Sequence, residues 1–230
     1  MLVQRCEAFF GLRGVGASIL LWLPLVAMAG LFSWPSPPVP PETTTQDVAH
    51  RIIFNGLDMR AQVFESQQTP EEIVAFYRKA WRGQVVVSQM GREQVIGHRE
   101  GDYFMTVQVS ASGSGSKGNI GVVDVATAPE HFVPGKGIPT PMDSKVFNDI
   151  RYPDDPIPTR MIALSNQLSP QQNISFYRER LEGEGWKPLN DHCAPSGCVL
   201  DFQRGDQKMN LVIERQENVR SQIVMTIQNP

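Results

Sequence analysis

The chain has 230 residues, of which 41% are hydrophobic and 20% are charged. This composition is ordinary for a folded core and excludes a largely disordered chain, while the length suits one large domain or two small ones. The formal net charge of −3 gives the surface no strong field that would attract polyanions, so we expect no nucleic-acid partner.

The N-terminal part of the chain contains a long apolar segment. Residues 14–33 carry no charge and follow Arg5 and Arg13, and their length is about what a helix needs to cross a bilayer. We expect a cytoplasmic tail at 1–13, a transmembrane anchor at 14–33 that contacts the lipid bilayer, and the bulk of the chain in the periplasm. The protein would then be a single-pass inner-membrane protein.

A cleaved signal peptide is the alternative interpretation of the same segment. Ala27 and Ala29 form an A-x-A cleavage site, and Pro24 would end the helix just before it. Cleavage after Ala29 would leave a soluble periplasmic protein. Both interpretations export everything that follows the apolar segment.

A proline-rich stretch comes next. Residues 34–41 read WPSPPVPP, and five of these eight residues are proline. Such a run favours polyproline II, which is extended and semi-rigid. We therefore expect a stalk over residues 34–47.

The chain then contains a repeated segment. Residues 69–81 read TPEEIVAFYRKAW, and residues 169–181 read SPQQNISFYRERL. Thr69 and Ser169 are suitable N-cap residues, and each is followed by a proline that fits the first helical position. The pattern predicts two helices of common origin.

Five aromatic residues of the repeats are predicted to form core contacts. They fall at helical spacing or directly after the second helix, which is typical of side chains that pack against a sheet. The predicted core residues of the repeat are Phe76, Tyr77, Phe176, Tyr177 and Trp186.

Strand-like segments with alternating apolar residues flank both helices. This pattern predicts an α+β fold of two tandem modules, each a strand, a helix and an antiparallel meander, with one helix packed on a 4–5 stranded sheet. The first module spans residues 48–128 and the second spans 159–230, with a proline-rich linker at 129–158. Tight turns are expected at Glu100–Asp102 and Arg204–Asp206, where glycine stands in the middle of each.

Cys193 and Cys198 enclose four turn-forming residues in the second module. In an oxidising exported compartment such a pair predicts a disulfide that closes a hairpin. A metal site built from His192 and the two cysteines is the alternative, but it lacks a fourth ligand. We expect no metal.

No motif for catalysis or cofactor binding is present. The glycine-rich stretch at 110–119 resembles a phosphate loop, but Lys117 is not followed by Ser or Thr, so a flexible hairpin loop is predicted there. The four histidines are scattered, and no G-x-S-x-G turn occurs. We therefore assign no catalytic residue and no cofactor.

Residues 169–186 resemble a module of exported bacterial proteins of unassigned function. The shared pattern is Ser/Thr-Pro at the helix start, then Phe-Tyr-x-x-x-Leu, then Gly-Trp. The first copy departs from it at Trp81 and lacks the Gly-Trp. The resemblance implies a packing unit and no activity.

An anchor, a stalk and two exported modules suggest a noncatalytic adaptor or assembly factor of an envelope machine, such as a secretion, pilus or cell-wall complex. Its partner would be another envelope protein. The alternatives are a periplasmic small-molecule-binding protein and an enzyme with a site between the modules.

Overall fold

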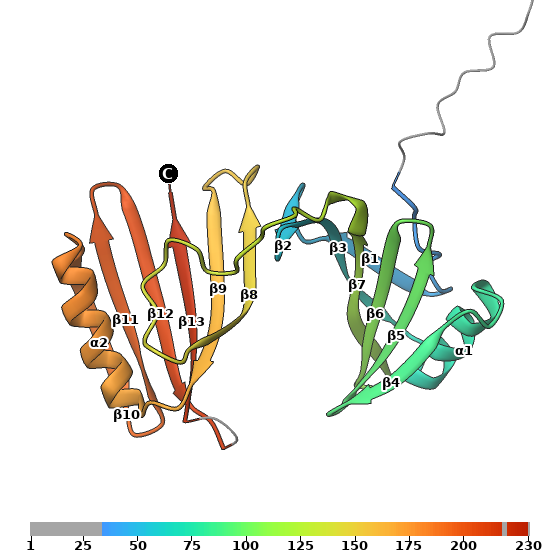
Figure 1. Cartoon of the computed structure of the whole chain (residues 1–230). Helices are drawn as coiled ribbons and strands as arrows, with labels where there is room; N and C mark the ends of the chain where they lie inside the picture. The colour runs from blue at the N-terminus through green and yellow to red at the C-terminus, as the bar shows by residue number, and fades with distance from the viewer. Residues whose placement is uncertain (1–33, 218–219, 230) are drawn as a thin grey trace, which may run out of the picture. The chain divides into compact units, whose positions relative to one another are not determined.

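A single antiparallel sheet dominates the structure. The computed structural model describes residues 34–217 and 220–229, so the expected tail at 1–13, the expected anchor at 14–33 and the cleavage site after Ala29 lie outside the described residues. Within the described residues, thirteen strands belong to one sheet (Figure 1). The described residues from position 35 onward form one compact unit.

The first part of the sheet contains the first copy of the repeat. Its elements are β1 (Thr43–Asp47), β2 (Ile52–Phe54), β3 (Leu57–Ser66), α1 (Pro70–Ala80), β4 (Val86–Met90), β5 (Glu93–Glu100), β6 (Tyr103–Ser112), β7 (Gly115–Asp124) and the short 3-10 helix η1 (Val125–Thr127). We call β3 to β7 with α1 the first repeat. Its strand order is β3-β7-β6-β5-β4, and β1 also pairs with β3.

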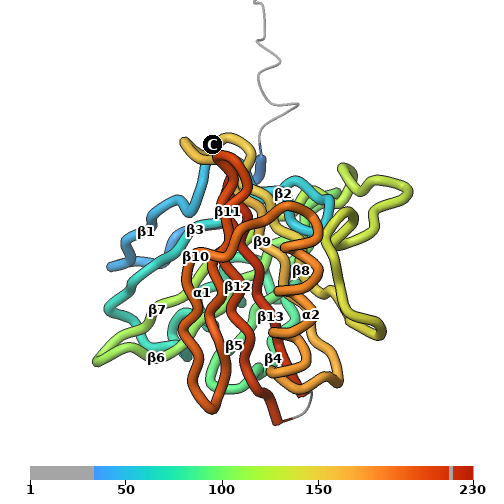
Figure 2. Tube along the Cα trace, turned by 90° about the vertical axis from the view of Figure 1, so that its left-hand side faces the viewer, coloured from blue at the N-terminus to red at the C-terminus, as the bar shows by residue number. Residues whose placement is uncertain are grey.

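The second part of the sheet has the same internal order. Its elements are β8 (Lys145–Tyr152), β9 (Thr159–Asn166), α2 (Pro170–Gly183), β10 (Lys187–Ala194), β11 (Gly197–Arg204), β12 (Gln207–Arg215) and β13 (Ser221–Gln228). We call β9 to β13 with α2 the second repeat. Its strand order is β9-β13-β12-β11-β10, and β10 to β13 form a meander whose chain path can be followed in Figure 2.

Both helices begin where the sequence predicts. The Thr69 hydroxyl accepts from the Glu72 backbone N–H, and the Glu72 carboxylate accepts from the Thr69 N–H at 2.8 Å. Ser169 and Gln172 make the same reciprocal pair at α2. A capping box satisfies backbone donors that a helix start leaves free, and the proline after each cap has no N–H to satisfy. The predicted helix starts are confirmed.

The predicted tight turns are also confirmed. Glu100 pairs with Tyr103, and Arg204 pairs with Gln207, so each hairpin has a two-residue loop. Gly101 has a φ of 57° and Gly205 a φ of 58°. Positive φ at the first loop position is typical of the type II′ turn, which matches the twist of an antiparallel hairpin and favours glycine there.

The predicted α+β class is wrong, because the fold is β-rich. Strands account for 52% and helices for 14% of the described chain. The two expected separate sheets are one sheet, since β2 pairs with β8 and so connects the two halves. Periodicity finds strands, but it does not show whether two sheets share an edge, because edge pairing depends on main-chain groups that every residue carries.

Two strands lie in segments that we assigned to the stalk and the linker. Residues 43–47, at the end of the expected stalk, form β1 and pair with β3. Residues 145–152, within the expected linker, form β8 and pair with β9 along most of its length. Both strands extend the sheet beyond the two repeats.

The turn between β2 and β3 holds β8 in place. Asn55 and Gly56 have φ values of 48° and 83°, which a type I′ Asn-Gly hairpin requires at both loop positions. The Asn55 N–H donates to the Asp149 carbonyl at 2.9 Å, and the Asn55 side-chain oxygen accepts from the Asp149 N–H at 2.8 Å. Its side-chain amide also donates to the Phe147 carbonyl at 3.1 Å. Asn55 thus prolongs the short ladder between β2 and β8.

The Asp149 carboxylate is a buried charge with several partners. It is only 1% exposed and accepts two hydrogen bonds from the Arg160 guanidinium, at 3.0 and 2.7 Å, and one from the Gly135 N–H at 2.9 Å. Burial alone would raise the pKa of Asp149, but the Arg160 and Gly135 hydrogen bonds and the charges of Arg160 and Arg151 outweigh it and lower the pKa. The carboxylate therefore fixes the loop around Gly135 to β8 and β9.

Asp149→Asn is expected to lower the free energy of unfolding by about 3 kcal/mol near neutral pH, because it leaves Arg160 largely buried without its counter-charge. The folded pKa of Asp149 lies below the unfolded value of about 3.9, so its stabilisation is complete above that value and is lost as the pH falls through the folded pKa. Urea denaturation between about pH 7 and pH 2 measures this, and the difference between wild type and variant should shrink in acid.

Asp58→Asn is the matched control. Asp58 pairs with Arg51 at an exposed position, so its loss should change stability by less than about 1 kcal/mol. Equal effects of the two substitutions would contradict the role given to Asp149.

Candidate functional site

The repeated aromatic residues lie mainly in the core. Tyr77 and Tyr177 are buried, and each packs edge-to-face with the half-buried phenylalanine before it, with ring centroids 5.2 Å apart for Phe76–Tyr77 and 5.1 Å apart for Phe176–Tyr177. Tyr177 shares one core cluster with strand residues of β9 and β11 to β13. These contacts are those of packing residues.

Trp186 is buried as well, and the Arg204 guanidinium lies 4.6 Å from the centroid of its ring. Arg204 also donates to the Glu184 carbonyl at 3.2 Å. A cation over an aromatic face stabilises the position of both side chains. The contact therefore holds the turn after α2 against the end of β11.

Neither buried tyrosine is suited to proton transfer. The hydroxyl groups of Tyr77 and Tyr177 have no hydrogen-bond partner within the described part of the chain, and burial strongly raises the pKa of both phenols. Both phenols therefore stay protonated at physiological pH. They contribute their rings to the core and no titrating group.

Cys193 and Cys198 lie at disulfide distance. They face each other on β10 and β11, with Cα atoms 4.1 Å apart. The bond closes the hairpin around Ala194–Gly197 and so strengthens the outermost strand pair of the second repeat. Residues 34–217 and 220–229 contain no cluster of metal-ligating side chains.

His98 is a structural residue of the first repeat. Its side chain is buried, its Nδ1 atom lies 2.6 Å from the Gln84 carbonyl oxygen, and its ring stacks on Trp81 at 4.6 Å. Asp102 and His192 lie at exposed turn and edge positions. None of these three residues lines the hollow described next.

The open face of the first repeat carries a groove. Met105, Val107 and Val109 of β6 are buried on the side that contacts α1. Because side chains alternate across a strand, Ser110 and its cross-strand neighbours Lys117 and Glu65 project from the opposite, uncovered side. We call this side the open face.

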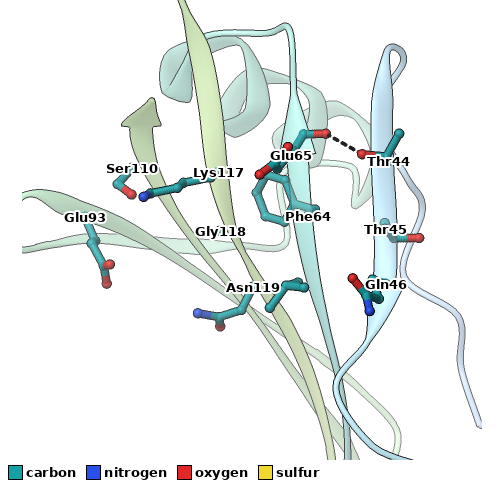
Figure 3. A pocket seen from close by; sticks show the side chains of 11 residues that line it. Thr44, Thr45, Gln46, Phe64, Glu65, Glu93, Ser110, Lys117, Gly118 and Asn119 are labelled. Carbon is teal, nitrogen blue, oxygen red and sulfur yellow. Dashed lines mark hydrogen bonds between the residues drawn. The ribbon is translucent and has the colours of Figure 1, made fainter. Parts of the chain in front are cut away.

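The groove has a volume of about 570 Å³ and crosses five strands of the first part of the sheet. Figure 3 shows its polar side chains arranged around an open hollow, with the Thr44 hydroxyl donating to the Glu65 carbonyl. Its lining residues are Thr44, Thr45, Gln46, Val63, Phe64, Glu65, Glu93, Ser110, Lys117, Gly118 and Asn119.

The lining offers hydrogen-bonding groups and one ammonium group. Lys117 lies opposite Glu65 and Ser110 in the strand register, yet its ammonium forms no salt bridge with another described residue. The Asn119 amide donates to the Gln108 side chain at 3.0 Å, and Val63 leaves 45% of its surface exposed beside it. The groove can therefore bind a polar chain and bury a little apolar surface.

The sequence does not predict this groove, because its glycine-rich stretch at 110–119 predicts a loop. The loop is only the turn between Ser112 and Gly115, and β7 begins at Gly115. The signal was present in the alternation of the small residues Ser116 and Gly118 with the polar residues at 117 and 119. Glycine and serine are weak strand formers, and their number concealed the alternation.

The open face of the second repeat has a smaller hollow of about 330 Å³. Asp201 and Lys208 line it, and the Asn210 amide donates to the Asp201 carboxylate at 2.7 Å. The open faces of the two repeats thus carry hollows at different places and with different chemistry.

Comparisons with known proteins give no assignment, since no family model, curated protein or solved structure matches the chain. The resemblance of residues 169–186 to exported bacterial proteins stays a prediction. Neither described helix is long and apolar enough to cross a bilayer.

Tyr177→Phe is expected to leave the free energy of unfolding unchanged or to raise it by about 1 kcal/mol, because it removes a buried hydroxyl that has no partner among the described residues. Tyr177→Ala should lower it by about 3–5 kcal/mol, since it removes a ring from a packed core. Urea denaturation measures both variants, and Tyr77→Phe is the matched test in the first repeat. A loss of more than about 1 kcal/mol in the Phe variants would mean that the hydroxyl has a partner.

Proposed function

We propose that the protein is a noncatalytic adaptor or assembly factor, anchored in the inner membrane with its bulk in the periplasm. It binds an extended polypeptide segment of an envelope partner in the groove on the open face of the first repeat. The apolar segment at 14–33 and the oxidised cysteine pair support the export of the described residues.

The observation that carries this proposal is the chemistry of the groove. Most of its side chains carry hydroxyl, amide, carboxylate or ammonium groups, and they come from five neighbouring strands. An extended peptide displays a backbone donor and acceptor at every residue, so such a lining can satisfy it along its length. The lining contains no histidine or cysteine, and binding is the function that it supports best.

Lys117 gives the groove a preference for a particular partner. Its ammonium lies in the groove without a salt bridge to any described carboxylate, and a partner carboxylate could pair with it there. Glu65 and Glu93 on either side would repel a strongly acidic chain. A mixed polar segment with a single acidic residue fits this arrangement.

A small-molecule ligand is the second candidate. The groove volume falls within the range of about 300–1,000 Å³ that small-ligand sites occupy. Such sites, however, bury most of their ligand, whereas this groove is open and has a mixed lining in which polar side chains lie beside Val63 and Phe64. A peptide segment therefore fits the groove better.

A photo-crosslinking amino acid at position 119 of the full chain, expressed in the source cell, is expected to form an adduct with one envelope protein. Lys117→Glu should reduce the yield of this adduct about tenfold, because it removes a charge-assisted hydrogen bond. Mass spectrometry identifies the adduct and its contact peptide.

The second repeat provides the control. The crosslinker at position 210, on the open face of the second repeat, should give no such adduct, and Lys208→Glu should leave the adduct at position 119 unchanged. Adducts of equal yield at both positions, or no effect of Lys117→Glu, would refute binding in the groove.

A further inference from the structure

The strand β4 ends the sheet with an unprotected edge. Among the described residues β4 pairs only with β5, so one side of its backbone has no strand partner. Its sequence VVSQM contains no charge and no proline. Val86 is 74% exposed and Met90 is 56% exposed. An edge of this kind favours pairing with another strand.

The matching edge of the second repeat is protected against such pairing. Its strand β10 contains Pro188, which has no N–H, and a register shift follows at Asn190. It also has charged residues, with Asp191 paired to Arg178, and a disulfide at its end. Proline, bulges and charges are the usual protections of sheet edges. The two repeats share one topology, so the bare edge of β4 is a feature of this strand rather than of the fold.

Two copies of β4 have complementary side chains when they pair antiparallel. In an antiparallel pair of two β4 strands centred on Ser88, Val86 would lie opposite Met90 of the other copy, and Val87 opposite its Gln89. The two serines would meet at the centre. Apolar side chains then face apolar ones on the open face, and no like charges oppose each other. A two-fold pair of this kind forms about six main-chain hydrogen bonds if Ser88 is a hydrogen-bonded position and about four if it is not, because the two kinds of residue pair alternate along an antiparallel ladder.

We propose that β4 is a dimerisation strand, which pairs antiparallel with β4 of a second copy of this chain about a two-fold axis through Ser88. Two-fold dimers are the commonest oligomers, and a self-complementary surface is what they require. The axis is perpendicular to the sheet, so the open faces of both copies lie on the same side. The dimer therefore presents two grooves on the same side. A partner with two binding segments would bind more tightly, because its second segment binds at a high effective concentration once the first is bound. The inference itself does not depend on what the groove binds.

Cysteine crosslinking tests the register. In the full chain with Cys6→Ser, which removes the one cysteine outside the Cys193–Cys198 pair, Ser88→Cys is expected to form an intermolecular disulfide on mild oxidation. Only this position of β4 meets itself across the axis, so Val86→Cys should crosslink far less. Val86→Cys together with Met90→Cys should again give efficient dimers. Asn190→Cys on β10 is the matched control and should give none.

A charge at the axis provides the second measurement. Ser88→Lys puts two ammonium groups opposite each other and is expected to raise the dimer dissociation constant about tenfold or more. Ser88 is exposed, so the fold should stay intact, which circular dichroism checks. Light scattering across a concentration series separates the 25.7 kDa monomer from its dimer after the detergent is subtracted. Asn190→Lys should leave the constant unchanged.

A monomeric wild type, a dimer that Ser88→Lys leaves unaffected, or crosslinking at 190 as efficient as at 88 would each overturn the proposal. If the chain dimerises but the crosslinker at position 119 gives no partner adduct, only the proposed function is refuted. The two ideas therefore fail separately.

Discussion

The hydrogen-bonding requirement of the strand backbones governs this structure. Backbone N–H and C=O groups are strong hydrogen-bonding groups, and a sheet satisfies them only where strands meet. Each repeat satisfies its inner strands by closing its last strand against its first, as in β7 with β3 and β13 with β9. The outer sides of β3 and β9 would still lack partners, and β1, β2 and β8 fill those places. The connection between the repeats therefore forms part of the sheet, and Asn55 and Asp149 hold its narrowest point.

The two repeats hold the start of their helix against the sheet with different side chains. At the start of α2, Asn166 and Asn173 exchange two buried hydrogen bonds at 2.8 and 3.1 Å, and the Ser221 hydroxyl donates to the Leu168 carbonyl. At the start of α1, Ile73 takes the place of the second asparagine, and the Ser116 hydroxyl has no partner among the described residues. A fully bonded polar network specifies one arrangement, whereas the first repeat relies on apolar packing at this point. The topology tolerates either solution because the strand pairing is the same in both.

The parts of the fold that the sequence predicts are those that depend on nearby residues. Thr69 and Ser169 mark helix starts because a cap, a proline and an amphipathic stretch act within one turn. The cysteine pair and the glycine turns are similarly local. The single sheet could not be predicted this way, since it depends on Ile53 and Phe54 of β2 pairing with β8 about a hundred residues later. The groove was missed for a related reason: its lining comes from five strands, and no single segment shows a motif.

Divergence between copies of a repeat shows where a surface has become specialised. Packing positions such as Tyr77 and Tyr177 keep the same residue because the helix must cover the sheet in both copies. The edges differ much more, since β10 carries proline, charge and a disulfide while β4 carries none of these. Protection of an edge reduces unwanted pairing, so an edge that lacks it either risks aggregation or has a use. The same reasoning applies to the open faces, where Lys117 of the first repeat forms no salt bridge with another described residue while the Asp201 carboxylate of the second already accepts from the Asn210 amide. The first repeat thus keeps both an edge and a face available for contacts, and the second repeat is the more closed of the two.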